Sequence, residues 1–139
     1  MEENNDSSDI RISEIPESYQ RYLDVIYEIS KTKRGGWVSN KEIAENLNVE
    51  PASVSGMLDK LKKRKLVIWE PRRAIRLTEK GKNYALELSE IHSILRKFFE
   101  KVLNLKNPEL VEKITCEIEH HITPKVKDSL NDFLTNYQE

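Results

Sequence analysis

The sequence of 139 residues lacks the features that define several classes of protein. Its single cysteine excludes an internal disulfide framework and suits a reducing compartment, so we expect a cytoplasmic protein. No apolar run approaches the roughly 20 residues that span a bilayer, and we expect no membrane partner. The polar, acidic residues 1–9 resemble neither a secretory nor a transit signal.

The formal net charge is only −1, but the charge is unevenly distributed along the chain. Residues 56–82 hold 10 lysines and arginines against 3 acidic residues, whereas residues 1–55 carry a net charge of −5 and residues 83–139 of −3. A concentrated basic segment is the footprint expected of a protein that binds phosphates. The small overall charge therefore does not exclude a nucleic-acid partner.

The apolar pattern of the first 63 residues predicts helices. Residues 1–12 have low hydrophobicity and no period, so they are expected to form a flexible tail. A helix beginning near Pro16 would bury a stripe at helical spacing, formed by Tyr19, Tyr22, Leu23, Ile26, Tyr27 and Ile29. Ser39 to Glu42 has the form of a capping box before a short helix, and Pro51 suits the first position of the next helix. Two short helices joined by a tight turn predict a helix-turn-helix.

Two short β-branched runs follow, at residues 66–69 and 74–77, and together with the preceding helices they predict a winged helix over residues 13–78. Small side chains at the start of the second helix suit base edges, and the lysines and wing arginines after them suit phosphates or the minor groove. The alternative is a plain surface helix with a lysine-rich end. The expected DNA-contacting residues are Ser39, Ala52, Ser53, Ser55, Gly56, Lys60, Lys63, Arg72 and Arg73.

Residues 79–139 predict an all-helical domain. Thr78 caps a long helix that should run to about Asn104, with His92 beside its apolar stripe. A second helix is expected over residues 108–122. The third follows Thr123 and Pro124 and should bury Val126, Leu130, Phe133 and Leu134. These helices supply more apolar surface than a small lobe needs, so a homodimer on double-stranded DNA is expected.

One motif on the second of these helices carries metal-binding chemistry. Cys116, Glu119 and His120 stand at i, i+3 and i+4, so a thiolate, a carboxylate and an imidazole are neighbours on one helix face. Mixed sulfur, oxygen and nitrogen donors suit a divalent transition metal, with the remaining ligands supplied from elsewhere. The alternative is equally open at this point, because a lone cysteine is usually a small buried hydrophobe and Glu-His-His can be a solvated face.

The order of these features resembles the diphtheria-toxin-repressor and manganese-transport-regulator family of metal-activated transcriptional repressors. The resemblance covers about residues 16–137 and rests on the winged helix, residues 77–81, a central His92 and the Cys116 motif. It implies the short form of the family, without an SH3-like domain. It also implies the metal ligands Asp24, His92, Glu112, Cys116, Glu119 and His120, with Glu112 as an ancillary ligand.

The chain departs from that family at several positions. Arg21 and Arg96 stand where the family has metal ligands, and a guanidinium cannot bind a cation. Gln20 and Glu17 are the candidates to replace the ligand lost at Arg21. Ser53 and Gly56 fall at base-probing positions, and Gly56 replaces a longer side chain there.

The resulting hypothesis is a repressor of metal-uptake genes. Fe²⁺ or Mn²⁺ would link the first helix to the sensor helices and so fix the spacing of two recognition helices. The sulfur of Cys116 favours iron. One alternative is a winged-helix repressor that senses a small organic ligand or the redox state through Cys116, which a chelator would distinguish. A metalloenzyme is disfavoured, since no general base and no Gly-rich phosphate loop accompany the cluster, and no small organic substrate is expected.

Overall fold

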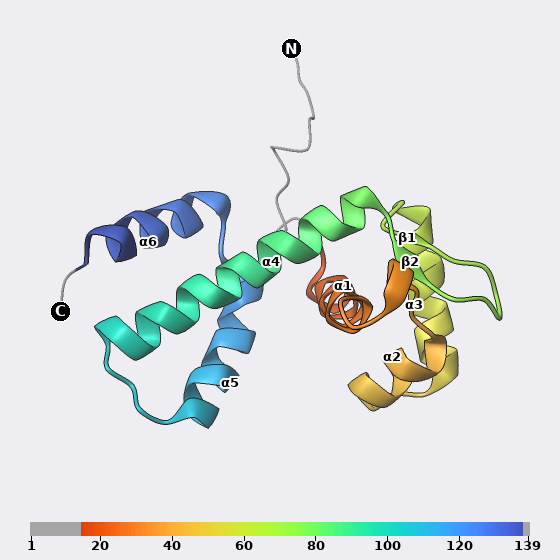
Figure 1. Cartoon of the computed structure of the whole chain (residues 1–139), viewed down its shortest axis with the longest axis horizontal. Coiled ribbons are helices and arrows are strands. Elements are labelled where there is room, and N and C mark those ends of the chain that lie inside the picture. The colour runs from red at the N-terminus through yellow and green to blue at the C-terminus, as the bar shows by residue number, and fades with distance from the viewer. Residues whose placement is uncertain (1–14, 138–139) are drawn as a thin grey trace, which may run out of the picture.

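The structure, a computed structural model, describes residues 15–137, so the tail expected at residues 1–12 lies outside this part. In chain order it contains α1 (Glu17–Ser30), α2 (Asn40–Leu47), α3 (Pro51–Lys63), β1 (Val67–Ile68), β2 (Arg76–Leu77), α4 (Glu79–Lys97), α5 (Pro108–Ile118) and α6 (Pro124–Asn136). Two lobes lie at opposite ends of α4, with α1 to α3 and the strands at one end and α5 and α6 at the other (Figure 1). The prediction of a mainly α fold is confirmed.

The predicted helix-turn-helix is formed by α2 and α3. The Ser39 hydroxyl accepts a hydrogen bond from the Glu42 N–H at 3.0 Å, and the Glu42 carboxylate accepts one from the Ser39 N–H at 2.9 Å. This capping box starts α2, which ends at Leu47 and is followed by the C-cap Asn48, where φ is 58°. Pro51 then begins α3 as predicted. The turn brings together the buried side chains of Ile43, Val54, Leu58 and Leu61.

The wing is a small antiparallel ladder. Val67 of β1 pairs with Leu77 of β2, and an isolated antiparallel bridge joins Val38 to Ile75, just before β2. The two predicted strands are therefore present, but each is only two residues long. Trp69 lies beyond the ladder and is buried in the core. The exposed tip between the strands carries Arg72 and Arg73, as expected for a wing.

The start of α4 is bonded to the turn that follows α3. The Thr78 hydroxyl accepts a hydrogen bond from the Gly81 N–H at 3.0 Å and donates one to the Lys65 carbonyl at 2.7 Å. A Cβ atom at Gly81 would lie 2.1 Å from the carbonyl oxygen of Leu66, so only glycine fits this approach. The direction of α4 is therefore fixed relative to the α3–β1 turn.

Two apolar cores flank the middle of α4. The first joins α1, α2, α3 and the strands, and includes Ala85 of α4. The second contains Ile15, Leu88, Ile91, Leu95 and Ile122. Of the predicted α1 stripe, Leu23 and Ile26 are fully buried and the other members pack partly buried around them. Among residues 15–137, α1 and α4 form the most extensive contact between two elements.

The second half differs from the sequence prediction in its helix ends. The long helix reaches Val102, but Phe98–Val102 is a π-helical segment. The helix predicted over residues 108–122 stops as α5 at Ile118. Glu119–His121 continues the chain as a 3-10 turn, so the segment predicted as one helix contains two helix types.

The predicted burial of the α6 stripe is wrong for two of its members. Val126 is 43% and Phe133 49% exposed, and Leu130 and Leu134 are only half-buried. The reason is that α6 contacts the rest of the chain chiefly through α4, which covers one side of the helix. The apolar residues of α6 therefore lie partly against α4 and partly on the exposed surface.

Candidate metal centre and nucleic-acid interface

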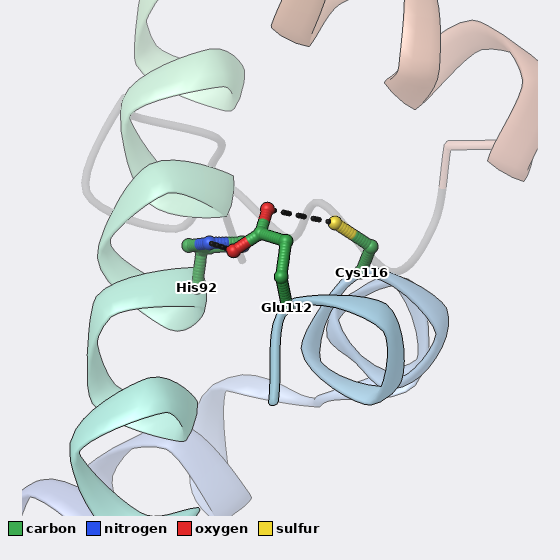
Figure 2. Close-up of side chains that lie close together, drawn as sticks. All are labelled: His92, Glu112 and Cys116. Carbon is green, nitrogen blue, oxygen red and sulfur yellow. Dashed lines mark hydrogen bonds and ion pairs between the residues drawn. The ribbon is translucent and has the colours of Figure 1, made fainter. Parts of the chain in front are cut away.

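Three of the expected metal ligands meet between α4 and α5. The donor atoms of His92, Glu112 and Cys116 all lie within 4.8 Å of one another (Figure 2). One oxygen of Glu112 is 3.3 Å from Nε2 of His92, and the other accepts a hydrogen bond from the Cys116 thiol at 3.3 Å. A nitrogen, an oxygen and a sulfur donor at these separations fit a single divalent transition-metal ion.

The other ring nitrogen of His92 contacts a second carboxylate. Nδ1 of His92 is 2.6 Å from Oε1 of Glu119, whose side chain is 6% exposed. This hydrogen bond raises the pKa of His92, against the lowering effect of burial. His92 therefore lies between the carboxylates of Glu112 and Glu119, one at each ring nitrogen.

The 3-10 turn places Glu119 and His120 beside one another in the interior. Oε2 of Glu119 is 3.7 Å from Nε2 of His120, and both residues are buried. Nδ1 of His120 is 2.7 Å from the amide oxygen of Gln20 on α1. Burial lowers the pKa of His120, which favours the neutral ring that metal ions require.

Asp24 approaches the cluster from α1. Burial raises the pKa of Asp24 to about 6, and the nearby charges of Glu119 and Glu28 add to the effect. The charge of His92 acts in the opposite direction. A carboxylate so placed is stabilised by a neighbouring cation.

The Cys116 side chain is protonated in the absence of a metal ion. Burial raises the pKa of its thiol to about 12, with the hydrogen bond and charge of Glu112 adding to the effect. A thiol with this pKa is a poor nucleophile, which argues against a redox-sensing cysteine. Coordination to a cation is the change that would favour the thiolate.

Neither arginine that departs from the family pattern occupies the centre of the cluster. The Arg21 guanidinium turns outward and lies 2.6 Å from the carboxylate of Glu17. Arg96, one turn after His92 on α4, lies 3.6 Å from Oε1 of Glu112 and 3.2 Å from Glu100. Gln20 is turned toward His120 rather than toward the three meeting donors, so it does not replace the lost ligand directly.

Within residues 15–137, the three side chains whose donor atoms all lie within 4.8 Å of one another are His92, Glu112 and Cys116. The sequence had grouped Cys116 with Glu119 and His120 instead. The sequence predicted one continuous helix over residues 108–122, whereas α5 ends at Ile118. Glu112 and Cys116 are related by one α-helical turn, and that spacing was the signal for their contact. The contact between Gln20 and His120 joins residues 100 positions apart and had no local signal.

The predicted DNA-contacting residues lie along α3 and at the wing. Ala52, Ser53, Gly56, Lys60 and Lys63 are all exposed on α3. A Cβ atom at Gly56 would meet nothing within 4 Å, so this glycine leaves bare backbone on the recognition helix. Ser55 is half-buried and accepts a hydrogen bond from the Asn40 amide at 3.1 Å, which links α3 to α2.

A pocket with a volume of about 620 Å³ lies between the start of α2 and the wing. Ser39, Ser55, Arg72 and Arg73 of the predicted set line it, together with Asn40 and Lys41. The Ser39 hydroxyl is engaged as the helix cap, so its place here is set by the fold. Asn40 and Lys41 were not among the residues predicted from the sequence, although Lys41 is exposed in the first turn of α2, where a helix N-terminus favours anions.

Two family models match successive parts of the chain. The model described as "Iron dependent repressor, N-terminal DNA binding domain" matches residues 14–75, and "Iron dependent repressor, metal binding and dimerisation domain" matches residues 78–139. The chain belongs to the iron-dependent repressor family. It is a metal-dependent DNA-binding repressor with a dimerisation domain, and its cofactor is a divalent transition metal. The resemblance inferred from sequence is confirmed.

Individual relatives agree with this assignment. The repressor is 32% identical over 122 residues to the HTH-type transcriptional regulator MntR of Shouchella clausii (strain KSM-K16), covering 88% of this chain and 82% of that protein. It is 30% identical over 122 residues to MntR of Bacillus subtilis (strain 168), covering 88% and 83%. Both relatives are bacterial regulators of similar length.

Solved structures give the same fold. A manganese-dependent transcriptional repressor complexed with manganese is 26% identical, with a TM-score of 0.73 over 87% of this chain and 54% of that one. The manganese regulator SloR is 28% identical, with a TM-score of 0.70 over 86% and 54%. The repressor thus spans about half the length of these two proteins.

The family assignment bears on the remaining expectations. It gives no support to the alternative of a repressor that senses an organic ligand or the redox state through Cys116. Its members are transcriptional regulators. Among the described residues, no helix has the length and apolar character needed to cross a membrane.

Proposed function

We propose that this repressor binds Fe²⁺ or Mn²⁺ through Asp24, His92, Glu112, Cys116, Glu119 and His120, and that it then represses metal-uptake genes. The observation that carries this proposal is the meeting of nitrogen, oxygen and sulfur donors from two helices within 4.8 Å. Manganese appears in the names of the solved relatives, and the thiol of Cys116 favours iron. Both ions are therefore included in the test below.

The donors come from four elements that meet near the middle of the molecule. Asp24 lies on α1, His92 on α4, Glu112 and Cys116 on α5, and Glu119 in the 3-10 turn that also carries His120. A bound ion supplies positive charge that compensates these carboxylates and favours one arrangement of the four elements. Because Thr78 and Gly81 hold the start of α4 against Lys65 and Leu66, just after α3, that arrangement would orient the recognition helix α3.

The DNA interface is proposed on the exposed side of the winged helix, residues 13–78. Lys60, Lys63, Arg72 and Arg73 would contact phosphates, and Ala52, Ser53 and Gly56 would approach base edges. Ser39 and Ser55 would take part chiefly as positioning groups, since their hydroxyls are bonded within the protein. Residues 79–139 would form the metal-binding and dimerisation domain, and two copies would present two recognition helices.

The test is metal-dependent DNA binding. A duplex pool selected by the repressor is titrated with protein under anaerobic, reducing conditions at one fixed salt concentration, with Fe²⁺, Mn²⁺, Co²⁺ or Zn²⁺. We expect Fe²⁺ or Mn²⁺ to increase affinity and a chelator to reverse the effect. Binding that is unchanged by every ion and by the chelator would contradict the proposal.

Two variants sharpen this experiment. Cys116→Ala should abolish the stimulation by metal, because it removes the sulfur donor. Ser93→Ala changes an exposed neighbour of His92 on α4 and should respond like the unaltered protein. Full stimulation of the Cys116→Ala variant would exclude the sulfur from the site. We further propose that the cluster has no catalytic role, which hydrolytic turnover by the metal-loaded protein would contradict.

A further inference from the structure

We infer that Gln20 is a positioning residue for the metal centre, because its buried amide holds the His120 ring so that Nε2 is the atom presented to the ion. The inference rests on the proposed function for the identity of the ion. It concerns a residue that is absent from the expected ligand set. The contact also joins α1, which belongs to the lobe of the winged helix (the DNA-binding lobe), directly to the 3-10 turn Glu119–His121 (the sensing segment).

The orientation of the Gln20 amide is determined by its surroundings. Gln20 is 1% exposed, and its Nε2 donates a hydrogen bond to the carbonyl oxygen of Ile15 at 2.7 Å. A backbone carbonyl can only accept, so the nitrogen end of the amide has to face Ile15. The oxygen end therefore faces His120.

The amide oxygen in turn determines the tautomer of the ring. Oε1 of Gln20 lies 2.7 Å from Nδ1 of His120, and an amide oxygen can only accept. Nδ1 has to carry the proton, so the lone pair of the neutral ring is at Nε2. Nε2 is the nitrogen that faces Oε2 of Glu119, at 3.7 Å. Hydrogen bonds of this kind orient metal-binding histidines in many proteins.

The position of Gln20 on α1 makes it suited to this role. Gln20 precedes Asp24 by one helical turn, so the amide and the carboxylate lie on the same side of α1. Its neighbour Arg21 faces outward to Glu17. One helix of the DNA-binding lobe thus brings an orienting group and a carboxylate to the sensing segment.

The first measurement is made on metal-free, full-length protein. Two-dimensional NMR of ¹⁵N-labelled histidine identifies the protonated ring nitrogen of His120, and we expect Nδ1 to carry the proton. In Gln20→Leu, which has similar size but no acceptor, we expect the Nε2-protonated form to appear. Gln20→Glu retains an acceptor toward Nδ1 and should retain the original tautomer.

The second measurement is the affinity for Mn²⁺ by competition with a fluorescent chelator. Gln20→Leu should weaken binding by about 10- to 100-fold, the usual cost of losing a group that orients a ligand. Gln20→Glu should recover most of the affinity, although it loses the donor to Ile15. Ile26→Val, which trims a fully buried side chain on the same helix, should change neither the tautomer nor the affinity.

The outcomes separate this inference from the proposed function. A proton on Nε2 of His120 in the unaltered protein would overturn the inference, and so would a Gln20→Leu variant with unchanged tautomer and affinity. Equal losses of affinity in Gln20→Leu and Ile26→Val would show a merely structural role and overturn it as well. Failure of the proposed function would appear instead as DNA binding that no ion stimulates, whatever the tautomer of His120.

Discussion

Asp24 is a carboxyl group in a place where its ionised form is unfavourable. Burial raises the pKa of Asp24 to about 6, and the negative charges of Glu119 and Glu28 contribute. Charging this residue at neutral pH without a metal ion therefore costs folding free energy. If Asp24 is a ligand as proposed, a divalent cation would remove that cost, and the residue would link stability to metal binding.

The unfavourable burial of the Asp24 carboxylate predicts that the effect of Asp24→Asn on the free energy of unfolding depends on pH. Between pH 3.8, the ordinary pKa of an aspartate, and about 6, the folded chain holds a proton at Asp24 that the unfolded chain has lost. The contribution of Asp24 to stability therefore falls as pH rises through this window. In urea unfolding with a chelator present, Asp24→Asn should be more stable than the unaltered protein by roughly 1–3 kcal/mol at pH 7.5.

The difference should disappear near pH 4, where Asp24 is protonated in the folded state. Asp128→Asn, an exposed aspartate on α6, is the matched control and should show no such dependence. Added metal should reverse the order, because it stabilises the unaltered protein more than the variant. A difference that is the same at both pH values would count against the unfavourable burial of the Asp24 carboxylate.

At the scale of the elements, helix starts could be predicted from neighbouring residues, whereas contacts between residues far apart in the sequence could not. The Ser39 capping box, Pro51 and the Thr78 cap act within a few residues, and all three begin helices where the sequence predicted them. By contrast, Glu119 and His120, in the 3-10 turn after α5, contact His92 and Gln20, which lie far away in the sequence. The sequence therefore could not predict which of the proposed ligands lie together, and the ligand set itself stays a prediction.

Two glycines of opposite environment give a prediction at this scale. Gly81→Ala should destabilise the protein by about 1–3 kcal/mol, the cost of overpacking, because its Cβ would lie 2.1 Å from the Leu66 carbonyl. Gly56→Ala is the matched control: its Cβ meets nothing within 4 Å, and alanine favours the helix by roughly 0.5–1 kcal/mol.

Thermal unfolding of the two variants beside the unaltered protein measures these effects, and we expect Tm changes of opposite sign. If Gly81→Ala unfolds at the original temperature, the close approach of α4 to the α3–β1 turn is not what orients the two helices. The Gly56→Ala variant also reports on DNA, since a methyl group on the bare face of α3 should alter base contacts.

At the scale of the whole molecule, α4 runs as one helix, Glu79–Lys97, from one lobe into the other. Its first turns contribute Ala85 to the core of the winged helix, and its middle contributes Leu88, Ile91 and Leu95 to the second core. Apolar side chains remain exposed in the lobe away from the wing, on α5 at Leu110 and Ile118 and on α6 at Val126 and Phe133. Such side chains suit the dimer interface of a dimerisation domain.

Phe133→Asp should therefore weaken the homodimer. Phe133 is 49% exposed on α6 and stacks edge-on with Phe98 at 6.4 Å between ring centroids. An interface aromatic commonly contributes 2 kcal/mol or more, so we expect the dimer dissociation constant to rise by about 30-fold or more in sedimentation equilibrium. Ile68→Asp, at a 51% exposed residue of the wing, is the matched control and should leave the dimer intact. A Phe133→Asp protein that is as dimeric as the control would exclude α6 from the interface.

The hydrogen bond between Gln20 and His120 has a consequence for how the repressor is made. It joins residues 100 positions apart, so at about 5–20 residues per second the ribosome adds the second partner about 5–20 s after the first. The acceptor of the Gln20 amide nitrogen, the Ile15 carbonyl, is already present at that time, whereas the contact of the amide oxygen with His120 can form only later. The direct bond between α1 and His120 is therefore made only after most of the chain has been translated.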